Sequence, residues 1–164
     1  LTASWLAQPS GIAVAPDGAS LLFTDSETSA VRRADIPGYR DGMVRTLVGE
    51  GLFDFGDIDG PRATARLQHP LGVAVDPETG VVYVADTYNN KIKRIDPATN
   101  DCVTWLGDGS AGLQDGSGTA ARFFEPAGLS IVDGTLYIAD TNNHAIRRAR
   151  LDDGQVETVD IRES

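Results

Sequence analysis

One pattern of apolar and polar positions is written three times along this chain. Each copy opens with a proline, has a glycine two residues later and continues as a short apolar run. A second apolar run then ends in an aspartate, and a basic residue stands eight positions further on. The copies occupy residues 9–33, 70–94 and 126–148. Repeats of this length, with several short strands in each, predict a propeller or an array of stacked units and not a single globular core.

The second copy shows the expected elements most clearly. Its strands are predicted at residues 73–76, 81–85, 91–96 and 104–106. The first two are apolar and are joined by a turn that contains Pro77 and Gly80. The third alternates charged and apolar residues, which is typical of a strand with one solvated face. Four antiparallel strands in a repeated unit are typical of a propeller blade.

The sequence therefore predicts an all-β fold, a β-propeller made of three four-stranded antiparallel blades that together span residues 1–164. The blades are expected at about residues 6–50, 67–107 and 123–161, with connectors at 51–66 and 108–122.

Three positions recur in every copy and have structural interpretations. The glycines are expected where inner strands crowd together near the axis, because only a residue without Cβ allows that approach. Each aspartate precedes a hairpin turn, where it can accept hydrogen bonds from turn amides or pair with the basic residue eight positions later. The sets are Gly11, Gly72 and Gly128; Asp25, Asp86 and Asp140; and Arg33, Arg94 and Arg148. Threefold recurrence favours a scaffold role, because one active site needs only one copy.

Composition narrows the range of functions. The chain has 164 residues, with 14 basic and 24 acidic side chains. The net charge of −10 argues against nucleic acid as a partner, because its phosphates would be repelled. No apolar run approaches the roughly 20 residues of a membrane-spanning helix, so direct membrane insertion is not expected. The single cysteine, Cys102, excludes an internal disulfide. Because the chain begins at Leu1 and not at Met, we expect a processed product or part of a longer protein.

The two connectors are the best functional candidates, because long loops in a compact domain commonly bind something. Function is expected where the copies differ. The first connector carries Phe53 and Phe55 among acids that include Asp57, whereas the second has Ala111 and Leu113 at the corresponding place. Exposed rings among acids would suit docking onto an apolar protein surface with a basic rim. The alternative is that both rings pack beneath the loop.

A second candidate contact lies in the first unit. The segment between its third and fourth strands is three residues longer than in the second unit. This insertion is expected to place Tyr39 and Arg40 at an exposed rim.

No catalytic or metal-binding pattern stands out, and no cofactor is expected. Asp54, Asp57 and Asp59 are clustered, but the twelfth position counted from Asp57 is Gln68, where a calcium loop needs a bidentate acid. The chain has no Gly-x-Ser-x-Gly elbow. Cys102 follows an acidic residue, which raises the pKa of a thiol, and we expect it to be unreactive.

The repeated residues resemble the NHL repeat, a unit of six-bladed β-propellers. The resemblance rests on the Pro-x-Gly start, on the run Y-V-A-D-T-Y-N-N-K-I-K-R at residues 83–94 and on its counterparts in the other copies. The connectors sharpen it, because Asp-Gly and Ala-Arg stand at fixed distances before both Pro70 and Pro126. This double motif is similar to the NHL propeller of multidomain proteins that also carry a thioredoxin-like domain, the suppressor-of-quenching type of photosynthetic cells and its animal relatives.

The resemblance implies a rigid binding platform for a protein partner or for other domains of the same polypeptide. It also implies that any redox chemistry resides in a separate thioredoxin-like module, since the chain has no Cys-x-x-Cys motif. The chloroplast thylakoid lumen is a plausible location by this resemblance alone.

Three blades are only half of a six-bladed ring and would leave two apolar faces open. Three outcomes follow from this mismatch. The chain is a fragment of a longer protein, or it pairs with a second copy that closes a six-bladed ring by two-fold symmetry, or a different subunit supplies the other half.

We therefore expect a non-enzymatic propeller platform. The alternative is part of a six-bladed propeller enzyme, a metal-dependent hydrolase or lyase. Such an enzyme needs inward acids, Asn or His from several blades, and the glycines Gly11, Gly72 and Gly128 offer no ligands there. Stoichiometric bound metal would favour the enzyme.

Overall fold

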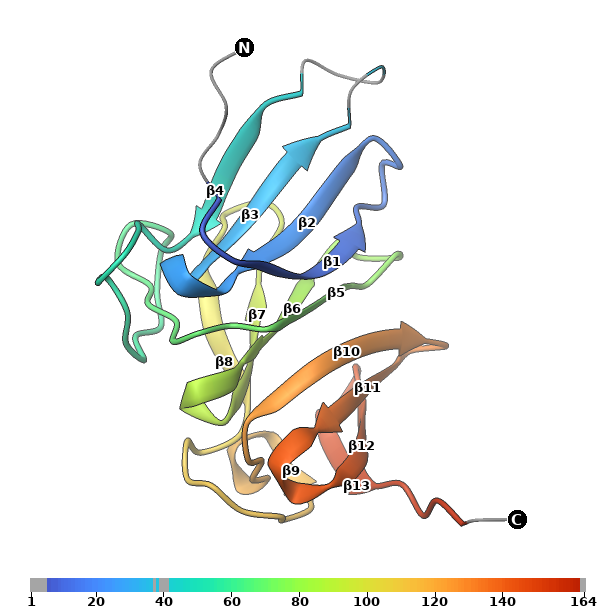
Figure 1. Ribbon diagram of the computed structural model, residues 1–164. Helices are drawn as coiled ribbons and strands as arrows, with labels where there is room; N and C mark the ends of the chain where they lie inside the picture. Colours follow the sequence, from blue (N-terminus) through green and yellow to red (C-terminus); the bar gives the residue numbers. More distant parts are fainter. Residues whose placement is uncertain (1–5, 37, 39–41, 163–164) are drawn as a thin grey trace.

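The computed structural model describes residues 6–36, 38 and 42–162, and its strands form three antiparallel sheets that follow one another along the chain (Figure 1). The first sheet contains β1 (Pro9–Val14), β2 (Ser20–Asp25), β3 (Ala30–Asp35) and β4 (Val44–Val48). The second contains β5 (Gly72–Val75), β6 (Val82–Asp86), β7 (Lys91–Ile95) and β8 (Cys102–Leu106). The third contains β10 (Pro126–Val132), β11 (Thr135–Asp140), β12 (Ala145–Arg150) and β13 (Gln155–Thr158), with the short β9 (Gly116–Ser117) beside β13.

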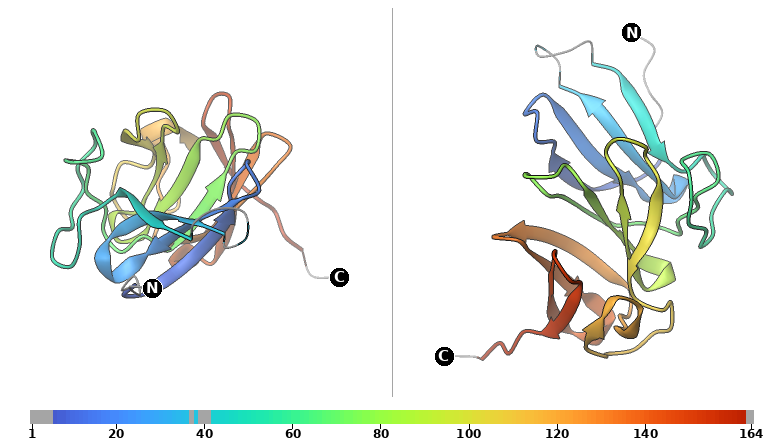
Figure 2. Two further views of the ribbon diagram at one scale, coloured as in Figure 1. Left: turned by 90° about the horizontal axis from the view of Figure 1, so that it is seen from above. Right: turned by 180° about the vertical axis from the view of Figure 1, so that it is seen from behind.

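The four main strands of each sheet form a meander, in which neighbours in sequence are neighbours in space; β9 is added at the outer edge of the third sheet. The inner strands β1, β5 and β10 pack against one another, and the three sheets are stacked in sequence order (Figures 1 and 2). This is the arrangement of successive propeller blades. The predicted all-β fold of three four-stranded blades, half of a six-bladed ring, is confirmed.

The core is divided into two layers, one between each pair of adjacent sheets. Strand β5 serves both layers. Val73 packs towards the first sheet and Ala74 towards the third, because successive side chains of a strand point to opposite faces. This explains why the sequence of β5 is continuously apolar, whereas that of β7 alternates.

The second and third strands of each sheet are joined by a short 3-10 helix. These helices are η1 (Ser26–Thr28), η2 (Thr87–Asn89) and η4 (Thr141–Asn143). Each ends at a residue in the left-handed conformation, namely Ser29, Asn90 and His144. Asn is one of the few residues that adopts this conformation at low cost.

The connectors fold back onto the outer edge of the sheet that follows them. In the first connector, Gly60 pairs with Cys102 of β8. In the second, Gly116 and Ser117 of β9 pair with β13, and η3 (Gly118–Ala120) follows. A helical turn follows the Asp-Gly of each connector, as η3 in the second and as a turn that starts at Pro61 in the first.

Within the described part of the chain, no helix has the length and apolar character needed to cross a membrane.

Candidate functional site

The three repeated aspartates are fully buried at the end of the second strand of each sheet. Asp86 accepts hydrogen bonds from the backbone N–H of Gln68 at 2.7 Å and from Nδ2 of Asn89 at 2.8 Å. Asp140 does the same with Phe124 and Asn143, both at 2.8 Å. Asp86 and Asp140 thus tie the chain that enters the inner strand to the turn beyond the second strand. Asp25 bonds the incoming chain alone in this way, through the N–H groups of Ala7 at 3.0 Å and Gln8 at 2.7 Å. The backbone donors therefore belong to the incoming chain and not, as predicted, to the turn, which contributes only the side-chain amides of Asn89 and Asn143.

The predicted pairing with the basic residue eight positions later is wrong. The partner is the basic residue seven positions later: Asp25 contacts Arg32 and Asp140 contacts Arg147, each at 2.9 Å, and Asp86 lies 3.7 Å from Lys93.

Strand register gives the reason. Lys93 lies opposite Val84, two residues from Asp86, so Lys93 and Asp86 share a face of the sheet. Arg94 lies opposite Tyr83 and points to the other face.

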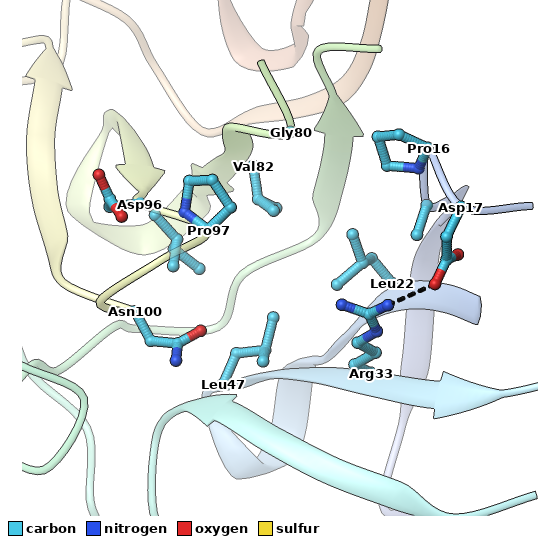
Figure 3. A pocket seen from close by; sticks show the side chains of 12 residues that line it. Pro16, Asp17, Leu22, Arg33, Leu47, Gly80, Val82, Asp96, Pro97 and Asn100 are labelled. Carbon is cyan, nitrogen blue, oxygen red and sulfur yellow. Dashed lines mark hydrogen bonds and ion pairs between the residues drawn. The ribbon is translucent and has the colours of Figure 1, made fainter. Parts of the chain in front are cut away.

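The basic residues eight positions after the aspartates, Arg33, Arg94 and Arg148, have other contacts or are exposed. Arg33 contacts Asp17 at 2.7 Å beside a cavity of about 180 Å³ between the first two sheets (Figure 3). Arg148 pairs with Glu157 at 2.7 Å on the surface, and Arg94 is exposed.

The buried cations also hold the connectors in place. Lys93 is fully buried and lies 2.8 Å from Asp57 and 2.9 Å from Asp59. Arg147 is likewise fully buried, contacts Asp115 at 2.7 Å and lies over the Phe123 ring at 5.2 Å. The repeated Asp-Gly of the connectors is therefore structural: its carboxylate neutralises the cation inside the following sheet.

The carboxylates around Lys93 have different pKa shifts. Burial raises the pKa of Asp86 to about 7, against the hydrogen bonds that it accepts. Burial also acts to raise the pKa of Asp57 and Asp59, but donors outweigh it and lower both. These donors are Lys91 and Lys93 for Asp57, and the Thr104 amide and Lys93 for Asp59. Asp57, a candidate for partner binding, thus directs its carboxylate to two internal lysines.

The first connector presents its two aromatic rings to solvent. Phe53 is 91% exposed and Phe55 is 57% exposed, so the rings do not pack beneath the loop. They line a groove of about 300 Å³ together with Leu52, His69 and Tyr88. Its polar residues are Ser26, Glu27, Ser29 and Gln68. We call the surface formed by Leu52, Phe53, Phe55, His69 and Tyr88 the aromatic groove.

An insertion and a strained backbone create this exposure. Eleven positions separate Gly49 from Gly60 in the first connector, whereas nine separate Gly107 from Gly116 in the second. Phe53 lies in this longer stretch with φ of 73°. A bulky side chain at positive φ is uncommon and costs on the order of 1–2 kcal/mol.

His69 and Tyr88 complete the groove and were not identified from the sequence. Their rings stack with centroids 4.5 Å apart and planes at 15°. The signal was available, because both positions change between copies: Glu125 stands where His69 is, and Asn142 where Tyr88 is.

Two of the three repeated glycines, Gly11 and Gly72, lie at the close approach between inner strands that the sequence predicts. A Cβ on Gly11 would stand 2.5 Å from the carbonyl oxygen of Leu71, and one on Gly72 would overlap the carbonyl oxygen of Ala127. Leu71 directly precedes β5 and Ala127 lies in β10, so both oxygens belong to the inner strand region of the next sheet. Gly128 has no such neighbour; a Cβ there meets only Ala139, at 3.5 Å.

Tyr39 and Arg40 lie outside the described residues. Among the residues that are described, no group of three His, Cys, Asp or Glu side chains is arranged to hold a metal ion. Cys102 is fully buried, and burial raises the pKa of its thiol to about 12, so burial and not the acidic neighbour keeps it protonated.

Comparison with solved structures supports the class that this architecture defines, a β-propeller. An auxiliary nutrient binding protein from Bacteroides thetaiotaomicron superimposes with a TM-score of 0.73 and 21% identity, over 91% of this chain and 37% of that one.

The family follows from sequence comparison. The NHL repeat model matches residues 67–95 and 123–148, and the chain belongs to the NHL-repeat β-propellers. NHL repeat-containing protein 2 of Bos taurus is 48% identical over 151 residues, which is 86% of this chain and 20% of that protein. Protein SUPPRESSOR OF QUENCHING 1, chloroplastic, of Arabidopsis thaliana is 46% identical over 156 residues, 91% of this chain and 14% of that protein. The chain therefore spans a fifth or less of the length of these relatives.

Proposed function

We propose that this protein is a non-enzymatic propeller platform whose aromatic groove binds a protein segment, carried either by a separate partner or by another domain of the same polypeptide. The observation that supports this most directly is the 91% exposure of Phe53 at positive φ. Backbone strain together with an exposed large apolar ring works against stability and solubility, and such features concentrate at binding sites.

The rigidity of the surroundings supports binding. The connector is fixed by Asp57 and Asp59 on Lys93 and by Asp54, which accepts a hydrogen bond from Arg66 Nε at 2.5 Å. A groove held in one shape loses little conformational entropy when it is occupied. Aromatic rings that become buried at the centre of an interface typically dominate its binding energy.

The charge around the groove indicates the partner. Glu27 lines it, Glu50 lies in the same connector, and the whole chain carries a net charge of −10. A segment with one large apolar side chain flanked by Lys or Arg fits this surface best, because the acids would speed its association and orient it.

A random peptide library selected on the intact protein tests the proposal. We expect enriched peptides to combine an apolar anchor with basic flanks. The double variant Phe53→Ala/Phe55→Ala should weaken the best peptide at least about tenfold, the equivalent of about 1.4 kcal/mol, while its thermal unfolding midpoint stays near that of the wild type.

Leu113→Ala is the matched control, because Leu113 is an exposed apolar residue of the second connector and should leave binding unchanged. Peptides that bind the double variant as tightly as the wild type would reject the groove. If the double variant fails to fold, the rings are structural and the proposal is wrong.

A further inference from the structure

A cavity of about 180 Å³ lies between the first and second sheets, close to hairpin turns of both (Figure 3). Its floor consists of buried apolar side chains from the facing strands, among them Leu22 of β2 and Val82 of β6. Its mouth is formed by exposed residues of the turns that follow β1 and β7, among them Asp17 and Pro97. Protein interiors are close-packed and contain few voids of this size, so the cavity has a specific cause.

Two differences between repeats account for the cavity. Leu22 and Leu47 line it, and strand register places Tyr83 and Trp105 at the equivalent positions of the second sheet. The rings of Tyr83 and Trp105 lie 4.7 Å apart and pack in the layer between the second and third sheets. Leucine is the smaller residue at both positions, so the first junction keeps a cavity where the second junction is filled by two rings.

The mouth of the cavity also differs between the two junctions. Asn100 of the first junction and Gly154 of the second both have left-handed backbone, with φ of 61° and 67°. A Cβ on Gly154 would stand 3.3 Å from Trp105 Nε1, so the indole occupies the place next to this glycine. The groove at the surface of the second junction is lined by turn residues such as Pro77 and does not extend to Trp105.

Two polar side chains at the first junction have hydrogen-bonding capacity to spare. Arg33 uses Nη2 for Asp17 at 2.7 Å and for Ser20 Oγ at 3.1 Å. Within the described part of the chain, Arg33 Nη1 makes no hydrogen bond, and neither does the side-chain amide of Asn100. Figure 3 shows the two side chains at the cavity on either side of Leu47. The cavity thus combines an apolar floor with two available polar groups.

The size of the cavity fits one six-membered ring. An apolar protein cavity of about 150 Å³ holds a benzene molecule. A cavity of about 180 Å³ therefore has room for such a ring with one small substituent. The apolar floor suits the ring, and the polar groups at the mouth suit a substituent that forms hydrogen bonds.

The charges at the mouth determine which substituent fits. Among the described residues that line the cavity, the charged side chains are Asp17, Arg33 and Asp96. Arg33 already neutralises Asp17, and Asp96 is exposed and ionised at neutral pH. A negatively charged substituent would be repelled by this excess of acid. An uncharged carboxamide can accept a hydrogen bond from Arg33 and donate one to Asn100.

We propose that this cavity binds a small uncharged compound that consists of an apolar ring and a carboxamide. The ring lies between Leu22, Leu47 and Val82, and the carboxamide oxygen accepts a hydrogen bond from Arg33 Nη1. The cavity lies at the opposite end of the strands from the aromatic groove, because the groove is formed beyond the ends of β2 and β6, whereas turns at the cavity precede them. The proposal is therefore independent of the function proposed above.

Titration of the full chain with benzamide, followed by NMR chemical shifts, tests the proposal. We expect saturable binding with a Kd on the order of 1 mM, as is usual for a ligand of so few atoms. Toluene lacks the carboxamide and benzoate replaces it with a negative charge, so both should bind more weakly than benzamide. Absence of saturable binding of benzamide would overturn the proposal, and tighter binding of benzoate would contradict the choice of an uncharged ligand.

A variant that copies the second junction tests the position of the site. Leu47→Trp/Asn100→Gly introduces the indole and the glycine that stand there, and it should weaken benzamide binding at least about tenfold while the protein stays folded. Leu113→Trp is the control, because it adds the same ring to an exposed position of the second connector, and it should leave binding unchanged. Unchanged binding by the folded double variant would show that the ligand does not occupy the cavity.

Two further variants test the polar contacts. Arg33→Met and Asn100→Gly should each weaken benzamide binding about fivefold, whereas toluene binding should stay the same, since its ring needs neither group. A purely structural role would change the binding of both ligands alike, and that result would contradict the proposal. Arg94→Met is the control, because Arg94 is the equivalent of Arg33 in the second sheet and is exposed, and it should affect neither ligand.

Discussion

At the scale of single residues, the face of the strand decides which of two adjacent basic residues is structural. Lys93 and Arg94 are neighbours in sequence, but Lys93 is fully buried among Asp57, Asp59 and Asp86, whereas Arg94 is exposed. Removing one partner of a buried ion pair is costly because the remaining charge stays buried without compensation.

Replacing these two residues in turn should separate their roles. Lys93→Met leaves the Asp86 carboxylate without its cation and should lower the free energy of unfolding by about 3–5 kcal/mol. Arg94→Met should change it by no more than about 0.5 kcal/mol. Urea unfolding of both variants measures the difference. Equal losses would contradict the assignment of the structural role to the seventh position.

A comparison of two glycines tests the close approach of the inner strands. Gly72→Ala places a Cβ against the carbonyl oxygen of Ala127, and we expect a loss of about 1–3 kcal/mol or more because backbone must shift. Gly56→Ala meets only the Arg66 side chain at 3.5 Å and serves as the control. Thermal unfolding distinguishes the two variants. Similar midpoints would mean that β5 and β10 do not approach as closely as the structure shows.

At the scale of elements, each connector acts as an additional edge of the sheet that follows it. Asp59 accepts hydrogen bonds from the Thr104 amide at 2.9 Å and from its hydroxyl at 3.0 Å, while Gly60 pairs with Cys102. In the third sheet, Asp115 accepts from Thr158 Oγ1 at 2.9 Å. The connectors therefore shield the outer edge strands β8 and β13 from pairing with other chains.

The carboxylates of Asp57 and Asp59 in the first connector should make the stability of the protein sensitive to acid. In the folded protein, hydrogen-bond donors outweigh burial and hold the pKa of Asp57 and of Asp59 below the usual aspartate value, so the unfolded chain binds more protons when the pH falls below about 4. Stability that is present above this pH is then lost as the pH decreases. The variant Asp57→Asn/Asp59→Asn should lose less stability between about pH 5 and pH 2 than the wild type, as measured by urea unfolding at several pH values.

Asp86 acts in the opposite sense. Burial raises its pKa to about 7, so its ionisation in the folded protein lowers stability as the pH rises from about 4 to about 7. The Asp57→Asn/Asp59→Asn variant should leave the pH dependence of stability between about pH 4 and pH 7 largely unchanged. If the free energy of unfolding of the double variant fell between about pH 5 and pH 2 as steeply as that of the wild type, the role of Asp57 and Asp59 would be contradicted.

At the scale of the whole molecule, the three sheets are held together by two apolar layers, and β5 contributes to both of them. Ile12, Val14 and Val132 lie outside these layers and are exposed.

The sequence by itself determined the repeat, the blade and the number of blades. Local patterning sufficed for these, because apolar runs, turn residues and the spacing of Pro and Gly act over a few residues. It also indicated the close approach at Gly11 and Gly72 and the differing loop with Phe53 and Phe55.

Only the tertiary structure decided which atoms meet. The partner of each buried aspartate depends on strand register, which sets the face of residues seven and eight positions away. Whether Phe53 is exposed depends on how the connector anchors to Lys93. The stacking of His69 on Tyr88 joins two segments, one on either side of β5 and β6. Such contacts arise from packing between distant segments, and packing is not encoded in any local pattern of residues.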